Sequence, residues 1–181
     1  MKATINNTKL VGVIRSLSRS ERAQCRKFLQ SPYFNSNRDL VKLFDAVDKL
    51  LQKERPLEKE VLWQKLRKEP YNDVRFRKYC SDLSKLLERY LAQIAFEADE
   101  NQQQVFLLKS LKSRDEAEKL RNSVMRSAEL LAENPPYLNV EFYLYQYQVQ
   151  RSFYDIFDFE TRRSDKANLE EISANLDLLY F

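Results

Sequence analysis

The sequence predicts an all-α fold of antiparallel helical hairpins, stacked as a bundle or as a short helical-repeat array. Only one of its 181 residues is glycine, so it lacks the Asn-Gly and Asp-Gly turns that β-hairpins favour. Apolar residues instead recur three and four positions apart, which is the spacing of a helix face. With 43% hydrophobic and 32% charged residues, the composition is that of a folded protein with a sizeable core.

Capping signals mark the first two predicted helices. Ser18 and Glu21 form a capping box that starts one helix, and Pro32 ends it, because proline disfavours the helical region for the residue before it. Ser36 or Asn37 then caps the second helix. Its apolar face consists of Leu40, Val41, Phe44, Val47, Leu50 and Leu51.

The turn between these helices contains two adjacent aromatic residues, Tyr33 and Phe34, where polar residues are usual. The simpler interpretation is that both rings fill the gap between the helices, with Phe34 near Leu40 as a hydrophobic staple. The alternative is an exposed aromatic contact site. Both interpretations place the two rings at an inter-helix corner.

Two further helices, at about 57–68 and 71–96, complete the N-terminal half. Pro56 suits the first turn of the shorter helix, and Pro70 lies just past its end. Cys80 falls on the apolar face of the longer helix and is predicted to be a buried structural thiol. That face consists of Phe76, Cys80, Leu83, Leu87, Leu91 and Ile94.

The region 57–96 has the order of a helix-turn-helix motif, although the connection is longer than the usual three or four residues. The solvent face of its longer helix is mostly basic, and the start of that helix would meet a DNA groove or phosphates. The alternative is an ordinary solvated face. The candidate nucleic-acid-binding residues are Arg75, Arg77, Lys78, Lys85 and Arg89.

A polar stretch at 99–104 predicts a boundary between a basic domain over 1–98 and an acidic, tyrosine-rich helical pair over 99–181. A short helix should follow around 105–111. A capping box at 113–116 opens another helix, which two prolines stop. That helix runs through Leu120, Val124, Ser127 and Leu131.

The next helix, predicted over about 138–160, is apolar on two sides. A helix of this kind is normally sandwiched, so we expect a neighbouring helix on each side. The main stripe is Leu138, Phe142, Tyr145, Val149, Phe153 and Ile156, and the second stripe is Tyr143, Tyr147 and Tyr154.

Asn168 and Glu171 start the last predicted helix, which ends on apolar residues without a cap or a charged tail. Such an ending predicts that the helical array continues beyond residue 181, and it makes self-association through this helix a second expectation. The candidate partner-binding residues are Tyr33, Phe34, Tyr143, Tyr147, Tyr154, Leu179, Tyr180 and Phe181.

Charge is divided unevenly along the chain. Residues 1–96 carry 21 Lys and Arg against 11 Asp and Glu, a net charge of +10, whereas residues 97–181 carry 10 against 16, a net charge of −6. This asymmetry indicates either a nucleic-acid or acidic-partner surface on the basic half, or two halves that attract each other.

The composition excludes most catalytic chemistry. The absence of histidine removes Ser-His-Asp and Cys-His catalysis, and one glycine cannot build a phosphate-binding loop. Cys25 has basic neighbours but no general base nearby, so we expect a half-buried packing residue. Asp155 and Asp158 could chelate a divalent cation, yet Arg162 offers an ordinary ion pair. We therefore expect no enzymatic activity, no cofactor and no metal, with a carboxylate-based enzyme as the remaining alternative.

The longest uncharged run of the aromatic-rich segment, 142–150, has nine residues, against about 20 for a membrane span. The N-terminus lacks the apolar block of a secretory signal, and two cysteines cannot form a disulfide framework. These features predict a cytoplasmic protein without a membrane partner.

A family resemblance lies within roughly residues 10–95, in LSRSERAQCRKFLQSPYFNSNRDLVKLF followed by VRFRKYCSDLSKLLERYL. These stretches resemble the N-terminal region of a family of uncharacterised bacterial proteins of many predicted helices, in which an SP-aromatic-FN corner precedes a helical array. The resemblance implies a longer helical-repeat protein and brings no known activity or catalytic residue.

We therefore expect a non-enzymatic helical module that binds or scaffolds another protein. The alternative is a DNA- or RNA-binding module that uses the basic face of the helix over 73–96.

Overall fold

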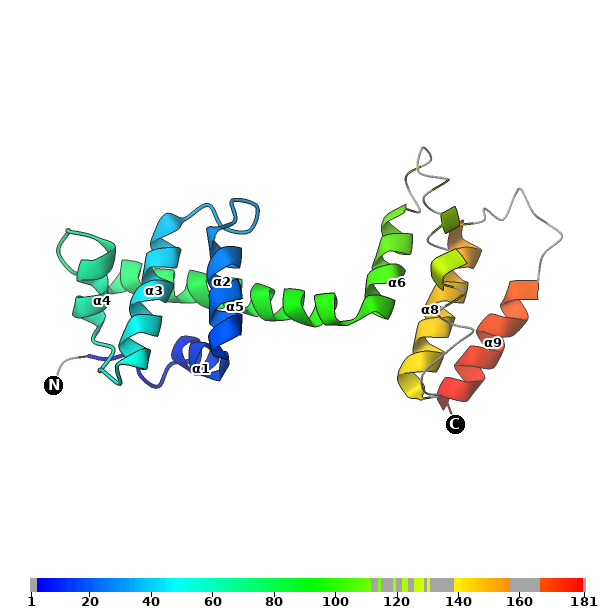
Figure 1. The fold of residues 1–181 in the computed structure, drawn as a ribbon, viewed down its shortest axis with the longest axis horizontal. Helices are drawn as coiled ribbons and strands as arrows, with labels where there is room; N and C mark the ends of the chain where they lie inside the picture. The colour runs from blue at the N-terminus through cyan, green and yellow to red at the C-terminus, as the bar shows by residue number, and fades with distance from the viewer. Residues whose placement is uncertain are drawn as a thin grey trace. The chain divides into compact units, whose positions relative to one another are not determined.

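The computed structural model describes residues 3–111, 139–156 and 167–180, together with positions 114, 119, 122, 123, 126–128 and 130. Every regular element in this part of the chain is an α-helix, which confirms the predicted all-α class (Figure 1). None of these helices is both long enough and apolar enough to cross a bilayer. The chain divides into two compact units, unit 1 over residues 1–94 and unit 2 over residues 95–181.

Unit 1 begins with a helix that the sequence pattern did not predict, α1 (Lys9–Ser16). It has only eight residues, and the Thr8 side chain at its N-cap makes no capping hydrogen bond. Three of its residues, Leu10, Val11 and Ile14, are buried in the core. Because so short a helix is marginal in isolation, tertiary packing must stabilise α1.

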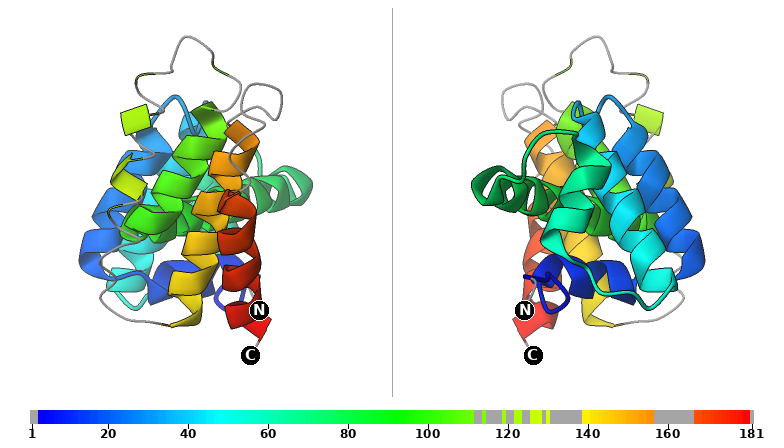
Figure 2. Two further views of the ribbon diagram at one scale, coloured as in Figure 1. Left: turned by 90° about the vertical axis from the view of Figure 1, so that its right-hand side faces the viewer. Right: turned by 90° about the vertical axis from the view of Figure 1, so that its left-hand side faces the viewer.

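Helices α2 (Arg19–Gln30) and α3 (Arg38–Gln52) begin at the predicted caps. The Ser18 hydroxyl accepts from the Glu21 amide at 3.2 Å, and the Glu21 carboxylate accepts from the Ser18 amide at 2.7 Å. Asn37, and not Ser36, caps α3. The two helices run antiparallel and side by side (Figure 1, Figure 2), joined by the ion pairs Arg22–Asp48 at 3.1 Å and Arg26–Asp45 at 2.8 Å.

The fourth helix, α4 (Lys59–Leu66), starts later than predicted, so Pro56 lies outside its first turn. The residues before α4 are extended, because they pair with the N-terminal segment. The Ile5 amide donates to the Leu57 carbonyl at 3.0 Å, and the Leu57 amide donates to the Asn6 side chain at 2.9 Å. This long-range pairing replaces the helical turn that the proline suggested.

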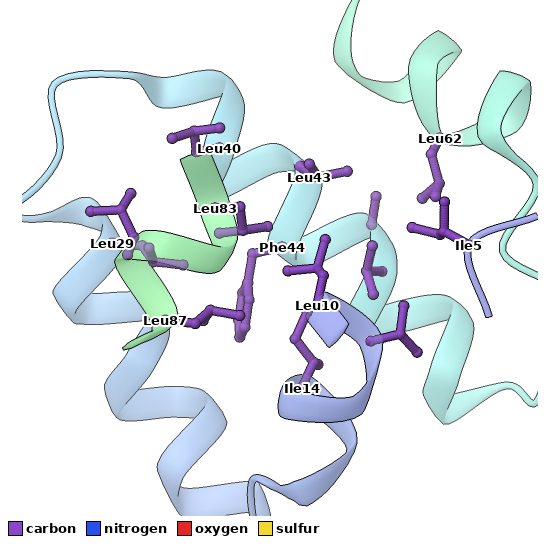
Figure 3. Packing of buried hydrophobic residues seen from close by; sticks show 14 of the residues in the cluster. Ile5, Leu10, Ile14, Leu29, Leu40, Leu43, Phe44, Leu62, Leu83 and Leu87 are labelled. Atoms are coloured by element: carbon purple, nitrogen blue, oxygen red, sulfur yellow. The ribbon is translucent and has the colours of Figure 1, made fainter. Parts of the chain in front are cut away.

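The long helix α5 (Asp73–Ala98) has 26 residues and crosses behind α2, α3 and α4 in Figure 1. Figure 3 shows Leu83 and Leu87 of α5 pointing toward Phe44 of α3 in the shared core. Cys80 is only half-buried, although it packs against this core as the stripe predicted. The fully or largely buried residues of α5 are Phe76, Leu83, Leu86, Leu87 and Tyr90.

Unit 2 contains α6 (Glu100–Leu111), α8 (Val140–Ile156) and α9 (Ala167–Tyr180). Helix α8 packs against both α6 and α9, as expected for a helix with two apolar sides (Figure 2). The predicted polar boundary at 99–104 is mostly helical, because Asp99 caps α6 by accepting from the Gln102 amide at 2.9 Å. The capping box at 113–116 and most of the helix predicted after it lie outside the described residues.

Replacing Phe76 with alanine should destabilise unit 1, because this ring is fully buried in the core. We expect the free energy of unfolding to fall by about 3–5 kcal/mol. Urea denaturation followed by the fluorescence of Trp63, the chain's only tryptophan, reports on this unit. Val74→Ala is the matched control, because Val74 is 79% exposed on the same turn of α5 and its loss should change the free energy by less than about 0.5 kcal/mol. Equal losses for the two variants would contradict the assignment of the core face.

Candidate functional site

The turn between α2 and α3 is held in one conformation by hydrogen bonds. The Ser31 carbonyl accepts from the amides of Phe34 and Asn35 at 3.1 and 3.0 Å. The Asn35 side chain donates to the carbonyls of Leu29 and Asn37 at 2.8 and 3.0 Å, and it accepts from the Asn37 amide at 2.9 Å. Because Asn37 in turn caps α3, the turn is fixed at both ends.

The ring of Phe34 lies on the ring of Phe28 from α2, with centroids 4.2 Å apart and planes 22° apart. Phe28 also contacts Tyr90 of α5, at a centroid distance of 5.6 Å. The prediction that Phe34 packs between the helices is confirmed, because it is part of the shell around the core. Its stacking partner, however, is Phe28, whereas the sequence suggested Leu40. We call residues 31–37, together with Phe28, the aromatic corner.

Tyr33 does not fill the gap between the helices, so the simpler prediction is wrong for this residue. Its ring stands perpendicular to that of Phe34, with centroids 5.0 Å apart. The side chain is 86% exposed, more than any other large apolar residue in the described part of the chain. The hydrogen-bonded turn therefore presents one aromatic ring to solvent from a fixed position.

One residue from each of the two predicted sets is found in contact at the aromatic corner. The guanidinium carbon of Arg89, predicted as a nucleic-acid contact, lies 5.6 Å from the centroid of Phe34, predicted as a partner contact. This is a cation–π distance. Lys85 lies one helical turn before Arg89 and is exposed. Sequence reasoning missed Phe28 and Tyr90, whose apolar spacing gives no sign that they support an exposed ring.

The basic residues at the start of α5 are engaged by carboxylates of the same chain. Arg75 pairs with Glu69 at 3.0 Å and Arg77 pairs with Asp73 at 2.6 Å. Lys78 is exposed and has no ion-pair partner among the described residues. The connection from α4 to α5 spans residues 67–72. The structure thus offers few uncompensated charges where a recognition helix would contact DNA.

Asp73 is the centre of a small polar cluster. Its carboxylate accepts from the Tyr71 hydroxyl at 2.6 Å and from the Lys59 ammonium at 2.9 Å. These two hydrogen bonds, with Arg77 nearby, lower the pKa of Asp73 to about 2. The cluster links the N-terminus of α5 to α4. Arg77, which the sequence suggested as a nucleic-acid contact, therefore has a structural role.

The other predicted partner contacts are in unit 2, and those whose side chains the structure describes do not form a comparable feature. Tyr143 is half-buried with its ring 5.3 Å from that of Phe142, and the Tyr147 hydroxyl accepts from Arg151 at 3.2 Å. Tyr154 is 37% exposed. Leu179 is half-buried, and the side chains of Tyr180 and Phe181 lie outside the described residues.

The cysteines do not offer a nucleophile. Cys25 is fully buried, more than the half-buried position expected from sequence, and burial raises its pKa to about 12. Burial also raises the pKa of Cys80, to about 11. Within the described part of the chain, no three Cys, Asp or Glu side chains are grouped to hold a metal ion. The Asp155 side chain and Asp158 lie outside that part.

Comparisons with known proteins found no matching family model, no matching curated protein and no matching solved structure.

Asp73→Asn should destabilise the protein at neutral pH and have little effect at low pH. The folded pKa lies below the ordinary value, so the carboxylate stabilises the fold above about pH 4 and loses this contribution as the pH falls toward 2. The thermal midpoint, followed by Trp63 fluorescence from pH 7 to pH 2, should therefore differ between variant and wild type at pH 7 and converge by pH 2. Glu60→Gln, an exposed change on α4, is the control; a difference that persists at pH 2 would refute the assignment.

In a Cys80→Ser background, Cys25 should react with a disulfide reagent only when the fold opens. With a pKa of about 12, only ~10⁻⁴ of the thiol is ionised at pH 8, and the side chain is inaccessible. We expect the reaction at pH 8 to be at least about 100-fold slower without urea than in denaturing urea. Rapid modification of the folded chain would show that this thiol is reachable after all.

Proposed function

We propose that this chain is a non-enzymatic protein-interaction module and that the aromatic corner is the surface that contacts its partner. The single observation that carries the proposal is the exposure of Tyr33, at 86%, on a turn whose backbone is fixed by hydrogen bonds. Exposing an aromatic ring to water is unfavourable, and the hydrogen bonds that fix the turn do not involve the Tyr33 side chain. A partner that covers the ring would remove this cost.

The geometry suits a binding anchor. Tyrosine is enriched among the residues that dominate interface energies, because it provides a large contact area at a small entropy cost. The Tyr33 ring packs edge-on against Phe34, and Phe34 stacks on Phe28. The Tyr33 side chain would therefore lose little conformational entropy when a partner binds. A preformed anchor of this kind supports specific binding by a small surface.

Nucleic-acid binding through the basic face of α5 is the second candidate. It is favoured by Lys78, Lys85 and Arg89, which are exposed and have no ion-pair partner among the described residues. It is disfavoured by the pairing of Arg75 and Arg77 with carboxylates of the same chain. It requires salt-sensitive binding to mixed-sequence duplex DNA that is lost when Lys78 and Lys85 are changed to glutamate.

We also propose a cytoplasmic location and a role within a longer helical array. A reducing compartment suits two cysteines that remain unpaired. The resemblance to bacterial helical-repeat proteins supports the scaffold role, in which unit 1 would display the aromatic corner.

Selection of a random 12-residue peptide library on the immobilised chain tests the interaction function. We expect clones that bind the wild type and Tyr33→Phe but lose affinity by about 30-fold for Tyr33→Ala, the loss typical of an interface anchor. Phe106→Ala is the matched control, because Phe106 is an aromatic residue of unit 2 that is 54% exposed. A library in which no clone depends on Tyr33 would refute the proposed role of the corner.

A further inference from the structure

Uncompensated positive charge lies beside the exposed ring. Arg89 sits over Phe34, on which Tyr33 rests, and it has no carboxylate partner among the described residues. Lys85, about 6 Å back along α5 by helix geometry, is exposed and likewise without an ion pair in that part of the chain. The ring that supports Tyr33 therefore has one cation, Arg89, over it, and a second cation, Lys85, lies one helical turn from Arg89 on α5.

A third cation, Lys27 of α2, directly precedes Phe28, the residue on whose ring Phe34 stacks. It is exposed and has no ion pair with another described residue.

The contrast with the rest of unit 1 makes this surface distinctive. Arg22 and Arg26 are paired with carboxylates of α3. Arg67 bonds Asp39 at 2.8 Å and lies within ion-pair distance of Glu69. Exposed lysines without a described partner also occur on α3 and α4, for example Lys49 and Lys65, but they do not adjoin an exposed aromatic ring.

We propose that the segment bound at the aromatic corner is acidic, with an apolar residue covering Tyr33 and carboxylates facing Arg89, Lys85 and Lys27. This inference rests on the proposed interaction function and specifies the chemistry of the partner. Charge complementarity carries it, because unit 1 has a net charge of +10 and leaves these three cations uncompensated around its anchor. Carboxylates at the rim of an interface chiefly speed association and select the partner, while the ring supplies affinity.

A phosphate backbone fits the same surface less well. The basic row along α5 is interrupted by Asp82, which lies between Lys78 and Lys85 at helical spacing. Proteins that bind single-stranded nucleic acid usually stack several bases on aromatic side chains. At this corner only the Tyr33 ring is exposed, because Phe34 is covered by Phe28 and Arg89. A short acidic peptide meets the three cations without needing a continuous track.

The peptide selection described above also tests this inference. Sequencing of the Tyr33-dependent clones should reveal enrichment in Asp and Glu over the starting library. One such clone, synthesised with a fluorescent label, should bind the full chain by anisotropy more weakly at 200 mM than at 50 mM NaCl. Lys85→Gln with Arg89→Gln should weaken binding by about fivefold, the sum expected for two exposed ion pairs. The matched control, Lys49→Gln with Lys65→Gln, removes the same charge from α3 and α4 and should leave binding unchanged.

The outcomes separate the two proposals. If Tyr33-dependent clones carry no excess of acidic residues, or bind the Lys85→Gln, Arg89→Gln chain as well as wild type, the acidic partner is refuted and the interaction function stands. If no clone depends on Tyr33, the interaction function itself is refuted. If a labelled 12-nucleotide poly(dT) binds more tightly than the peptide, and Lys85→Gln with Arg89→Gln weakens that binding, the surface would be assigned to single-stranded nucleic acid. Lys85→Gln alone, which removes no hydrogen bond or ion pair within the described part of the chain, guards against a loss caused by unfolding.

Discussion

The burial of one face of α5 is the constraint on which unit 1 depends. Helices α1 and α4 have eight residues each, and helices of that length are marginal in water without tertiary packing. Helices α1, α2 and α4 pack against α3, and the buried face of the 26-residue α5 contributes to the same core. Its opposite face is then left to solvent, which is why the cations of α5 are exposed whatever their function.

This arrangement also determines what lies beneath the exposed ring. Tyr90, the last buried residue of α5, donates from its hydroxyl to the Glu21 carbonyl of α2 at 2.9 Å. Its ring contacts Phe28, which supports Phe34, and Phe34 supports Tyr33. The chain of ring contacts runs from the core to the surface, so the position of an 86% exposed side chain follows from buried packing.

Most helices could be predicted from sequence because their signals are local. The capping box at Ser18 and the apolar spacing of α3 and α5 need no knowledge of the rest of the chain. The start of α4 could not be predicted, because Leu57 pairs with residues 51 or more positions away. The backbone conformation of the turn decides which of two adjacent rings is buried. The sequence therefore could not predict that Phe34 is packed and Tyr33 is exposed. The Asp73–Arg77 ion pair could be predicted from its i, i+4 spacing. The Arg75–Glu69 ion pair could not, because it depends on the conformation of the turn before α5.

Net charge alone is therefore a poor guide to what unit 1 binds. Its +10 charge suggests an anionic ligand, but at Arg22, Arg26, Arg67, Arg75 and Arg77 the chain's own carboxylates already pair with the cation. Exposed pairs of this kind contribute little stability, and their larger effect here is to remove binding sites for outside anions. What distinguishes the aromatic corner is the coincidence of cations without described partners and a rigid apolar anchor. In the proposed binding mode the anchor would supply affinity and the charges would supply discrimination, so the proposal rests on the two features together.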